Sequence, residues 1–247
     1  MASRSVWYDK AIEYWTAVVP LTDLFHVVST SMHDPPLYSF LLNLWFMIGI
    51  DELWARLPAF YASMIALAGI LHIGRKYYGW KVGLVAGLFF AISAADIRYA
   101  QEIGQYSLMI CLTVWNFHFL LRATQQRKLY DWLLWGGTAA LSLYSHYGSA
   151  IIIFTTSATA LCYLVYRRHW QAIAYQVTTG IVVILSLIPI FVFIMPTQMS
   201  RLGAEPLAIN FREFVAISSR ILAFPIVSMG AFIFGLGQPT RFGPLLC

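Results

Sequence analysis

Long apolar runs, separated by short polar turns, fill most of the chain after residue 56. The runs cover 57–73, 82–95, 104–121, 132–146, 148–165, 172–195 and 214–236. An α-helix of about 20 apolar residues crosses the hydrocarbon core of a bilayer, and its backbone groups are satisfied internally. The pattern therefore predicts an all-α fold, a polytopic membrane helix bundle with about seven spans.

The first 56 residues have a different pattern. Residues 6–18 have amphipathic spacing, and 35–50 is apolar but short and begins with Pro35-Pro36. A run of that length suits a helix lying at the headgroup level. We interpret 1–56 as an external loop with amphipathic juxtamembrane helices and 57–247 as the transmembrane bundle. An external start and an abrupt end predict a fragment, incomplete at both ends, of a longer protein.

Composition supports a membrane protein. Hydrophobic residues make up 60% of the chain and charged residues 11%, against about 45–50% and 25% in soluble domains. The net charge of +5 lies in short clusters between apolar runs and does not indicate nucleic-acid binding. The three cysteines have neither metal-binding nor redox spacing.

Basic clusters follow every second apolar run. They are Arg75-Lys76 with Lys81, Arg122 with Arg127-Lys128, and Arg167-Arg168. The excess of Lys and Arg in cytoplasmic loops assigns all three to the cytoplasmic side. Ten of the eleven acidic residues then fall at or near the external loops, with Asp131 the exception. This predicts a working surface on the external face.

Four short motifs lie in the predicted external loops. They are SVWYDKA at 5–11, HDPPLY at 33–38 with Trp45, Gly49 and Arg56-Leu57-Pro58 behind it, DIRYAQEIGQYS at 96–107, and LYSHY at 143–147. In order and spacing they resemble the C-type membrane glycosyltransferases, in particular the protein-mannosyltransferase-like family 39, whose relatives include aminoarabinose transferases of lipid A. The resemblance covers residues 5 to 147.

The resemblance implies an inverting glycosyltransferase, a hexosyl- or pentosyltransferase that uses a polyprenyl-phosphate-linked sugar. Its acceptor would be a protein, glycan or lipid at the external face of a membrane, in bacteria the periplasmic face of the inner membrane. Asp9 would be the catalytic base and Glu102 a second catalytic acid close to it, and the same two carboxylates would hold a divalent metal ion. The candidate substrate-binding residues are His33, Asp34, Arg98, Gln101, Tyr106, His146, Arg201 and Arg220.

Three positions depart from the family pattern. Lys10 stands where the family has Glu, and Gly104 where it has Arg. Asp34 directly precedes Pro35-Pro36, where His is usual, and His33 is displaced by one residue. Losing one acid and one arginine would weaken metal and phosphate binding.

Other interpretations remain open. A non-catalytic or truncated homologue could bind the lipid-linked sugar without transferring it, as Lys10 and Gly104 suggest. A transporter or flippase would show paired repeats, and none is visible in the sequence. Asp9 could be a solvated acid or helix cap, Glu102 could favour a helix N-terminus, and His146 could bond a carbonyl at a helix end.

Overall fold

The computed structural model describes residues 8–31 and 35–194, apart from the side chains of Tyr8, Asp9 and Ser31. Over these residues the chain is helical and forms no strand, which confirms the all-α fold. The short helices are α1 (Tyr8–Val18), α2 (Leu21–Ser31), α3 (Leu37–Trp45) and α6 (Ala94–Gln101). The longer ones are α4 (Glu52–Ile73), α5 (Trp80–Ile92), α7 (Tyr106–Gln126), α8 (Leu129–Ser145), α9 (Ser149–Tyr166) and α10 (Trp170–Ser186). Two π-helical turns, η1 (Gly74–Tyr78) and η2 (Ile190–Ile194), extend α4 and α10.

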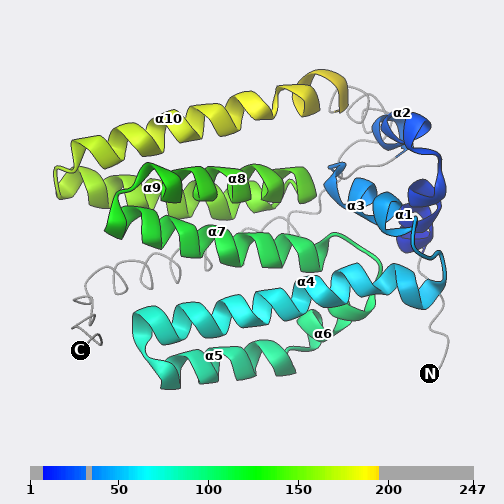
Figure 1. Ribbon diagram of the computed structural model, residues 1–247, viewed down its shortest axis with the longest axis horizontal. Coiled ribbons are helices and arrows are strands. Elements are labelled where there is room, and N and C mark those ends of the chain that lie inside the picture. Colours follow the sequence, from blue (N-terminus) through cyan, green and yellow to red (C-terminus); the bar gives the residue numbers. More distant parts are fainter. Residues whose placement is uncertain (1–7, 32–34, 195–247) are drawn as a thin grey trace, which may run out of the picture.

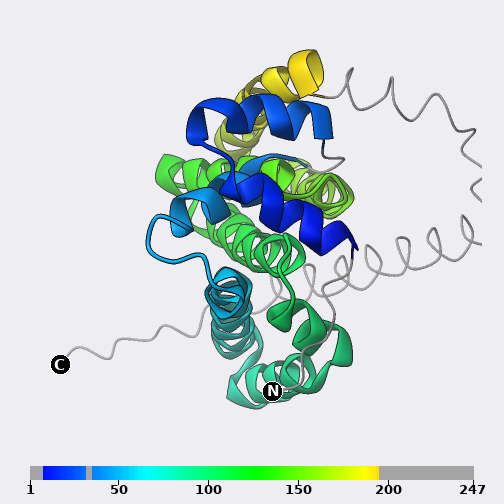
Figure 2. The same ribbon diagram turned by 90° about the vertical axis from the view of Figure 1, so that its right-hand side faces the viewer.

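The longer helices run side by side along the long axis of the molecule, and α1, α2 and α3 gather at one end (Figure 1). Seen from that end, the three short helices lie across the ends of the bundle helices (Figure 2). Helix α7 is central and packs against α4, α8 and α9. We call the two ends of the bundle the α1–α3 end and the opposite end.

Two apolar clusters fix this arrangement. Near the opposite end, buried side chains of α4, η1, α7, α8, α9 and α10 pack together, with Trp132 and Leu120 fully buried. At the α1–α3 end, Ala17, Tyr38 and Leu42 pack on Ala55 at the start of α4 and on Ile103 before α7. This second cluster attaches the short helices to the loop between α6 and α7.

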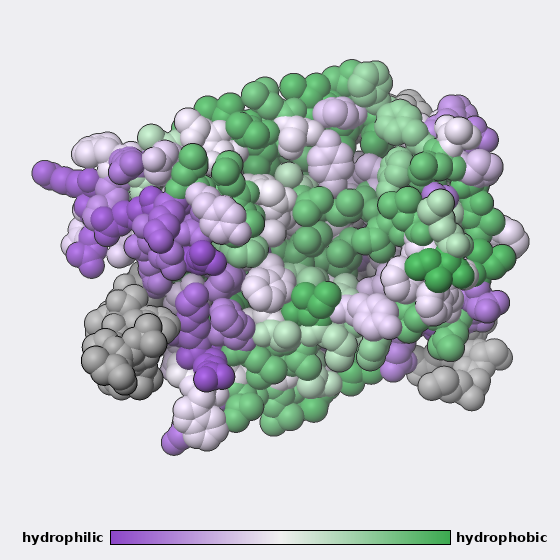
Figure 3. Space-filling view, in the orientation of Figure 1, coloured by the Kyte–Doolittle hydropathy of each residue, from purple (hydrophilic) through white to green (hydrophobic). Residues whose placement is uncertain are grey.

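The outward faces of the long helices are apolar (Figure 3). Large hydrophobic side chains point outward from several helices, among them Phe89, Phe154, Val182 and Ile184. Such a surface would not be stable in water, and it suits contact with lipid tails.

The described residues contain three helices long and apolar enough to cross a membrane: Glu52–Tyr78, Ser149–Tyr166 and Trp170–Ile194. A fourth candidate is the pair α5 and α6, which bends by 61°. The bend falls at Ser93, whose hydroxyl accepts from the Asp96 amide at the start of α6. This bend therefore interrupts the apolar run at 82–95 that was expected to form one span.

The expected number of about seven spans is not confirmed. Helix α7 carries Asn116, His118 and Arg122 along its length, and α8 has 17 residues. Both helices lie within the bundle, where neighbouring helices bury their polar side chains. The length of an apolar run therefore does not by itself identify them as membrane spans. The run at 214–236 lies outside the described residues.

Close backbone contact joins α4 to α5. A Cβ on Gly74 would lie 2.4 Å from the Cα of Gly83, so both positions need glycine for space. The chain then reverses at Gly79, whose φ of +103° disfavours residues with a side chain.

The turns that join α4 to α5, α7 to α8 and α9 to α10 lie at the opposite end, and hydrophilic residues gather there (Figures 1 and 3). The three basic clusters lie in these turns and in the helix ends beside them, and Lys76 is close enough to Arg122 to interact electrostatically. Desolvation and the charges of Arg127 and Arg167 lower the pKa of His169 in the same region. The basic clusters thus share one end, as the sequence pattern predicts.

Asp131, the acidic exception, has a structural role at this end. Its side chain is fully buried, and its Oδ1 lies 2.7 Å from Nε of Arg122. The pair joins α7 to α8 across their turn, which explains an acid among the basic clusters.

Candidate functional site

A row of rings at the α1–α3 end brings three of the four motifs together. Tyr106, the first residue of α7, stacks on Tyr99 of α6 with ring centroids 4.8 Å apart. The centroid of the Tyr106 ring also lies 5.4 Å from the centroid of the His146 ring and 5.1 Å from Nζ of Lys10. Tyr106 is therefore the meeting point of α1, α6 and the end of α8.

The second motif reaches the same loop through Tyr38. Its buried hydroxyl accepts a hydrogen bond of 3.1 Å from the backbone N–H of Gly104. Burial raises the pKa of the Tyr38 hydroxyl, and the negative charge of Glu13 raises it further. Together these two effects outweigh the hydrogen bond from the Gly104 N–H, which lowers the pKa. The hydroxyl therefore stays neutral and holds the loop between α6 and α7 in place.

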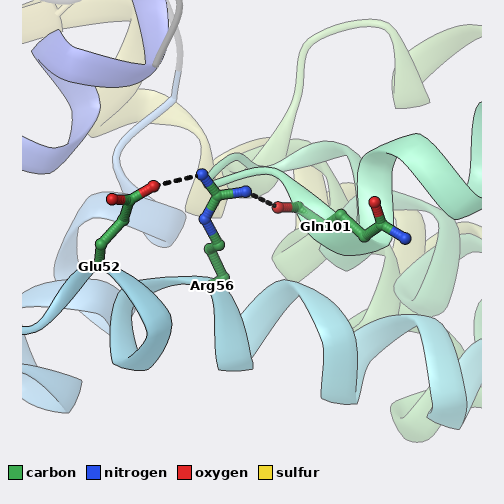
Figure 4. A network of polar contacts seen from close by, with 3 residues as sticks. All are labelled: Glu52, Arg56 and Gln101. Atoms are coloured by element: carbon green, nitrogen blue, oxygen red, sulfur yellow. Dashed lines mark hydrogen bonds and ion pairs between the residues drawn. The ribbon is translucent and has the colours of Figure 1, made fainter. Parts of the chain in front are cut away.

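Arg56 fixes the end of α6 to the start of α4. Its guanidinium donates to the carbonyl oxygen of Gln101 over 2.6 Å and to Oε1 of Glu52 over 2.5 Å (Figure 4). Gln101, a predicted substrate-binding residue, takes part through its backbone, and its side-chain amide points away from Arg56 (Figure 4).

Glu102 and Arg98 form an ion pair over one turn of helix. Nε of Arg98 lies 2.8 Å from Oε1 of Glu102, and the two side chains are 55% and 22% exposed. Glu102 directly follows α6 as its C-cap residue and lies four residues before the start of α7 at Tyr106. A carboxylate at a helix C-terminus is unfavourable to the helix dipole. The ion pair with Arg98 offsets this effect.

His146 ends α8 and shapes the turn into α9. Its Nδ1 accepts a 2.9 Å hydrogen bond from the N–H of Gly148, so this nitrogen carries no proton. Its carbonyl oxygen accepts from the Ser149 hydroxyl over 2.7 Å. His146 thus has a structural role in the turn while its ring faces Tyr106.

Two buried charged residues of α1 lie against the α6–α7 loop. Lys10 is 8% exposed and Glu13 is 4% exposed. A Cβ on Gly104 would lie 2.6 Å from Nζ of Lys10 and 3.5 Å from Oε2 of Glu13. Sequence reasoning did not single out Glu13 as a site residue. The available signal was its position four residues after Asp9, which places both on one face of a helix.

Several predicted site residues lie outside the described part of the chain. Asp9 belongs to the first turn of α1, but its side chain is not described. His33, Asp34, Arg201 and Arg220 fall in undescribed segments. The closeness of Asp9 and Glu102 therefore stays a prediction, although their neighbours Lys10 and Gly104 meet.

The described side chains do not form a metal site. Among them, no group of three His, Cys, Asp or Glu side chains is placed to hold an ion. One carboxylate oxygen of Glu102 is also engaged by Arg98. A divalent metal at Asp9 and Glu102 stays a prediction, and no step proposed below passes through it.

Comparison with known proteins identifies the family. The model of the dolichyl-phosphate-mannose-protein mannosyltransferase family matches residues 33–195. The match includes the second, third and fourth motifs, and the first motif with Asp9 and Lys10 precedes it. No curated protein and no solved structure matches the chain. With about two thirds of its length matched and its motifs brought to one place, the chain belongs to the dolichyl-phosphate-mannose-protein mannosyltransferase family of C-type membrane glycosyltransferases.

Proposed function

We propose that the protein transfers a sugar from a polyprenyl-phosphate-linked donor to an acceptor at the α1–α3 end of the bundle. The observation that supports this most directly is the meeting of Lys10, Tyr99 and His146 around Tyr106. These residues come from motifs far apart in the sequence, and aromatic rings beside charged groups suit a site for a sugar and its phosphate.

The reaction would be a single displacement. An acceptor oxygen attacks the anomeric carbon from the side opposite the phosphate, which inverts the configuration of that carbon. The new C–O bond forms as the bond between the anomeric carbon and the phosphate oxygen breaks, and the electron pair leaves on polyprenyl phosphate. The acceptor proton passes to a carboxylate, which we assign to Asp9, with Glu102 as the second acid of the site.

We assign the site to the external face of the membrane. The basic clusters lie at the opposite end of the bundle, and such clusters favour the cytoplasmic side. The apolar outward faces of the long helices would offer the polyprenyl tail a surface within the bilayer.

The test is a product assay with the full-length protein in proteoliposomes. It is given polyprenyl-phosphate donors with different hexoses and pentoses and a mixture of peptide, glycan and lipid acceptors. Mass spectrometry should find one sugar transferred, and the anomeric configuration of the product should be opposite to that of the donor. Binding of a donor without any transfer would support the non-catalytic alternative, for which Lys10 and Gly104 are the motivating departures.

A further inference from the structure

The turn between α9 and α10 lies at the boundary of the membrane-spanning part of the chain. It consists of Arg167, Arg168 and His169, and it joins two of the candidate spans, Ser149–Tyr166 and Trp170–Ile194. Three residues extend over about 10 Å at most, and because this turn returns to the membrane, it reaches outward by only about half of that. The headgroup layer on each side of a bilayer is about 5–7 Å thick. The two arginines are therefore held within the headgroup layer.

Exposed aromatic rings mark the same level. Tyr166 and Trp170 flank the turn, and Trp80 and Tyr130 lie beside the other two turns at the opposite end of the bundle. All four side chains are exposed. Tyrosine and tryptophan are enriched where a membrane protein meets the headgroups, because one part of the ring system is apolar and another is polar. A surface that binds soluble anions needs no such rings, so they favour a lipid as the partner of this end.

Positive charge is concentrated at this end and is almost unopposed (Figure 3). The three basic clusters contain eight of the sixteen lysines and arginines of the chain. In these turns and the helix ends beside them there is one acid, Asp131, which is buried and paired with Arg122. The other seven basic residues are exposed. Clusters of basic residues next to membrane-spanning helices attract anionic lipids.

Two of the turns come together at His169. Desolvation, followed by the charges of Arg127 in the α7–α8 turn and of Arg167, lowers the pKa of His169. The guanidinium of Arg167 also lies over the Tyr163 ring, 5.7 Å from its centroid, and this contact holds it beside α9. Charges from two separate turns thus act on one point, where a lipid phosphate would be attracted by both.

The backbone conformation of two arginines indicates a role for their side chains. In the described part of the chain, Arg127 and Arg168 are the residues other than glycine with positive φ, 56° and 57°. Arg127 caps the C-terminus of α7, and Arg168 follows the cap residue of α9. Glycine is usual at such positions, because a Cβ is disfavoured in this conformation. Ending a helix therefore does not require arginine at either position.

We propose that the α7–α8 and α9–α10 turns form a binding site for the phosphate of an anionic phospholipid, held by Arg127 and Arg167 with Lys128 and Arg168 beside them. The acyl chains of this lipid would lie along the apolar outward faces of the long helices. The site is at the other end of the bundle from the ring row around Tyr106. Its occupant is a lipid of the surrounding bilayer, so a protein without transferase activity would still hold it.

The first experiment compares two lipids that differ in headgroup charge. Binding of phosphatidylglycerol and of phosphatidylcholine with the same acyl chains to the full-length protein in an uncharged detergent is measured by native mass spectrometry. The wild-type protein should prefer phosphatidylglycerol. R127Q/R167Q should bind it about 10- to 30-fold more weakly, since each cation near a membrane surface contributes about fivefold, and should bind phosphatidylcholine as before. Equal binding of the two lipids by the wild-type protein would overturn the proposal.

The matched control removes the same charge from the same end of the molecule. R75Q/K81Q changes the α4–α5 turn and should lower the affinity for phosphatidylglycerol only slightly. An equal loss in both double variants would show a diffuse attraction of the whole end and would refute a site between the two turns. R127K/R167K keeps both charges and should retain the preference for phosphatidylglycerol, which keeps the proposal testable if R127Q/R167Q fails to fold. Displacement of the lipid by millimolar inorganic phosphate would identify a soluble anion as the occupant and contradict a lipid.

Arg127→Gly separates lipid binding from helix capping. Glycine is favoured at a left-handed position, so the melting temperature in uncharged detergent should stay the same or rise. The affinity for phosphatidylglycerol should fall by about fivefold, because one cation is lost. A lower melting temperature with unchanged affinity would assign Arg127 to the helix end alone and remove it from the site.

Discussion

Arg98 donates from Nε to Oε1 of Glu102 across 2.8 Å, one turn apart at the end of α6. If Arg98 acts through this carboxylate, Arg98→Gln should reduce transfer in the wild-type background and have little further effect in Glu102→Gln. The Arg98 side chain is half exposed and the Glu102 side chain partly buried, and i,i+4 pairs on helices add about 0.3–0.5 kcal/mol to stability. Thermal unfolding should therefore change little. Equal effects of Arg98→Gln in both backgrounds would show that Arg98 acts independently.

Asp9→Asn should lower the transfer rate at saturating donor by about 10² to 10⁴ if Asp9 is the general base. The change keeps the shape of the side chain and removes the charge that accepts the proton. Donor affinity, measured separately, should be unchanged. A near wild-type rate would remove Asp9 from the catalytic role, and joint loss of donor affinity would favour an action through a bound metal.

Breaking the Arg122–Asp131 pair should destabilise the bundle. In Arg122→Met the fully buried Asp131 loses its cation, and breaking a buried pair costs about 3–5 kcal/mol. Arg122 is 31% exposed, so we expect the lower part of that range or less. Thermal unfolding in detergent measures the change.

The double variant R122M/D131N should be more stable than Arg122→Met, since the buried charge is then also removed. An unchanged melting temperature in Arg122→Met would show that the pair contributes nothing.

Gly74→Ala should also lower the melting temperature, because the added methyl group meets backbone atoms of Gly83 at 2.4 Å. The matched control is Gly137→Ala in α8, where a Cβ would have no neighbour within 4 Å. The control should be neutral or slightly stabilising, since the helix propensity of alanine is more favourable than that of glycine by about 1 kcal/mol. Similar losses in both variants would argue against the close approach of α4 and α5.

The orientation is tested by cysteine labelling in intact cells, in a protein whose three native cysteines are replaced by alanine. Cysteines at the exposed positions 23 and 97 should react with an impermeant thiol reagent, as should one at position 205, which lies outside the described residues. One at the exposed position 126 should not react until the membrane is opened. The reverse labelling would place the α1–α3 end in the cytoplasm.

The sequence determined the all-α membrane fold, because apolar run length and the scarcity of charge are properties of the chain alone. It also determined that the basic clusters share one end, since they follow every second run. The number of spans was not determined in this way. Helix α7 buries Asn116 and His118 against its neighbours, and the run at 82–95 bends at Ser93.

The tertiary structure alone decided which residues of the motifs meet. Lys10 and Gly104 are 94 positions apart and each departs from the family pattern, and only the packing of α1 on the α6–α7 loop makes the two departures one contact. The same packing brings the Tyr38 hydroxyl to the Gly104 N–H and places Glu13 beside Gly104. A sequence pattern reports which face of a helix is apolar, whereas contacts between helices depend on how whole helices pack against each other.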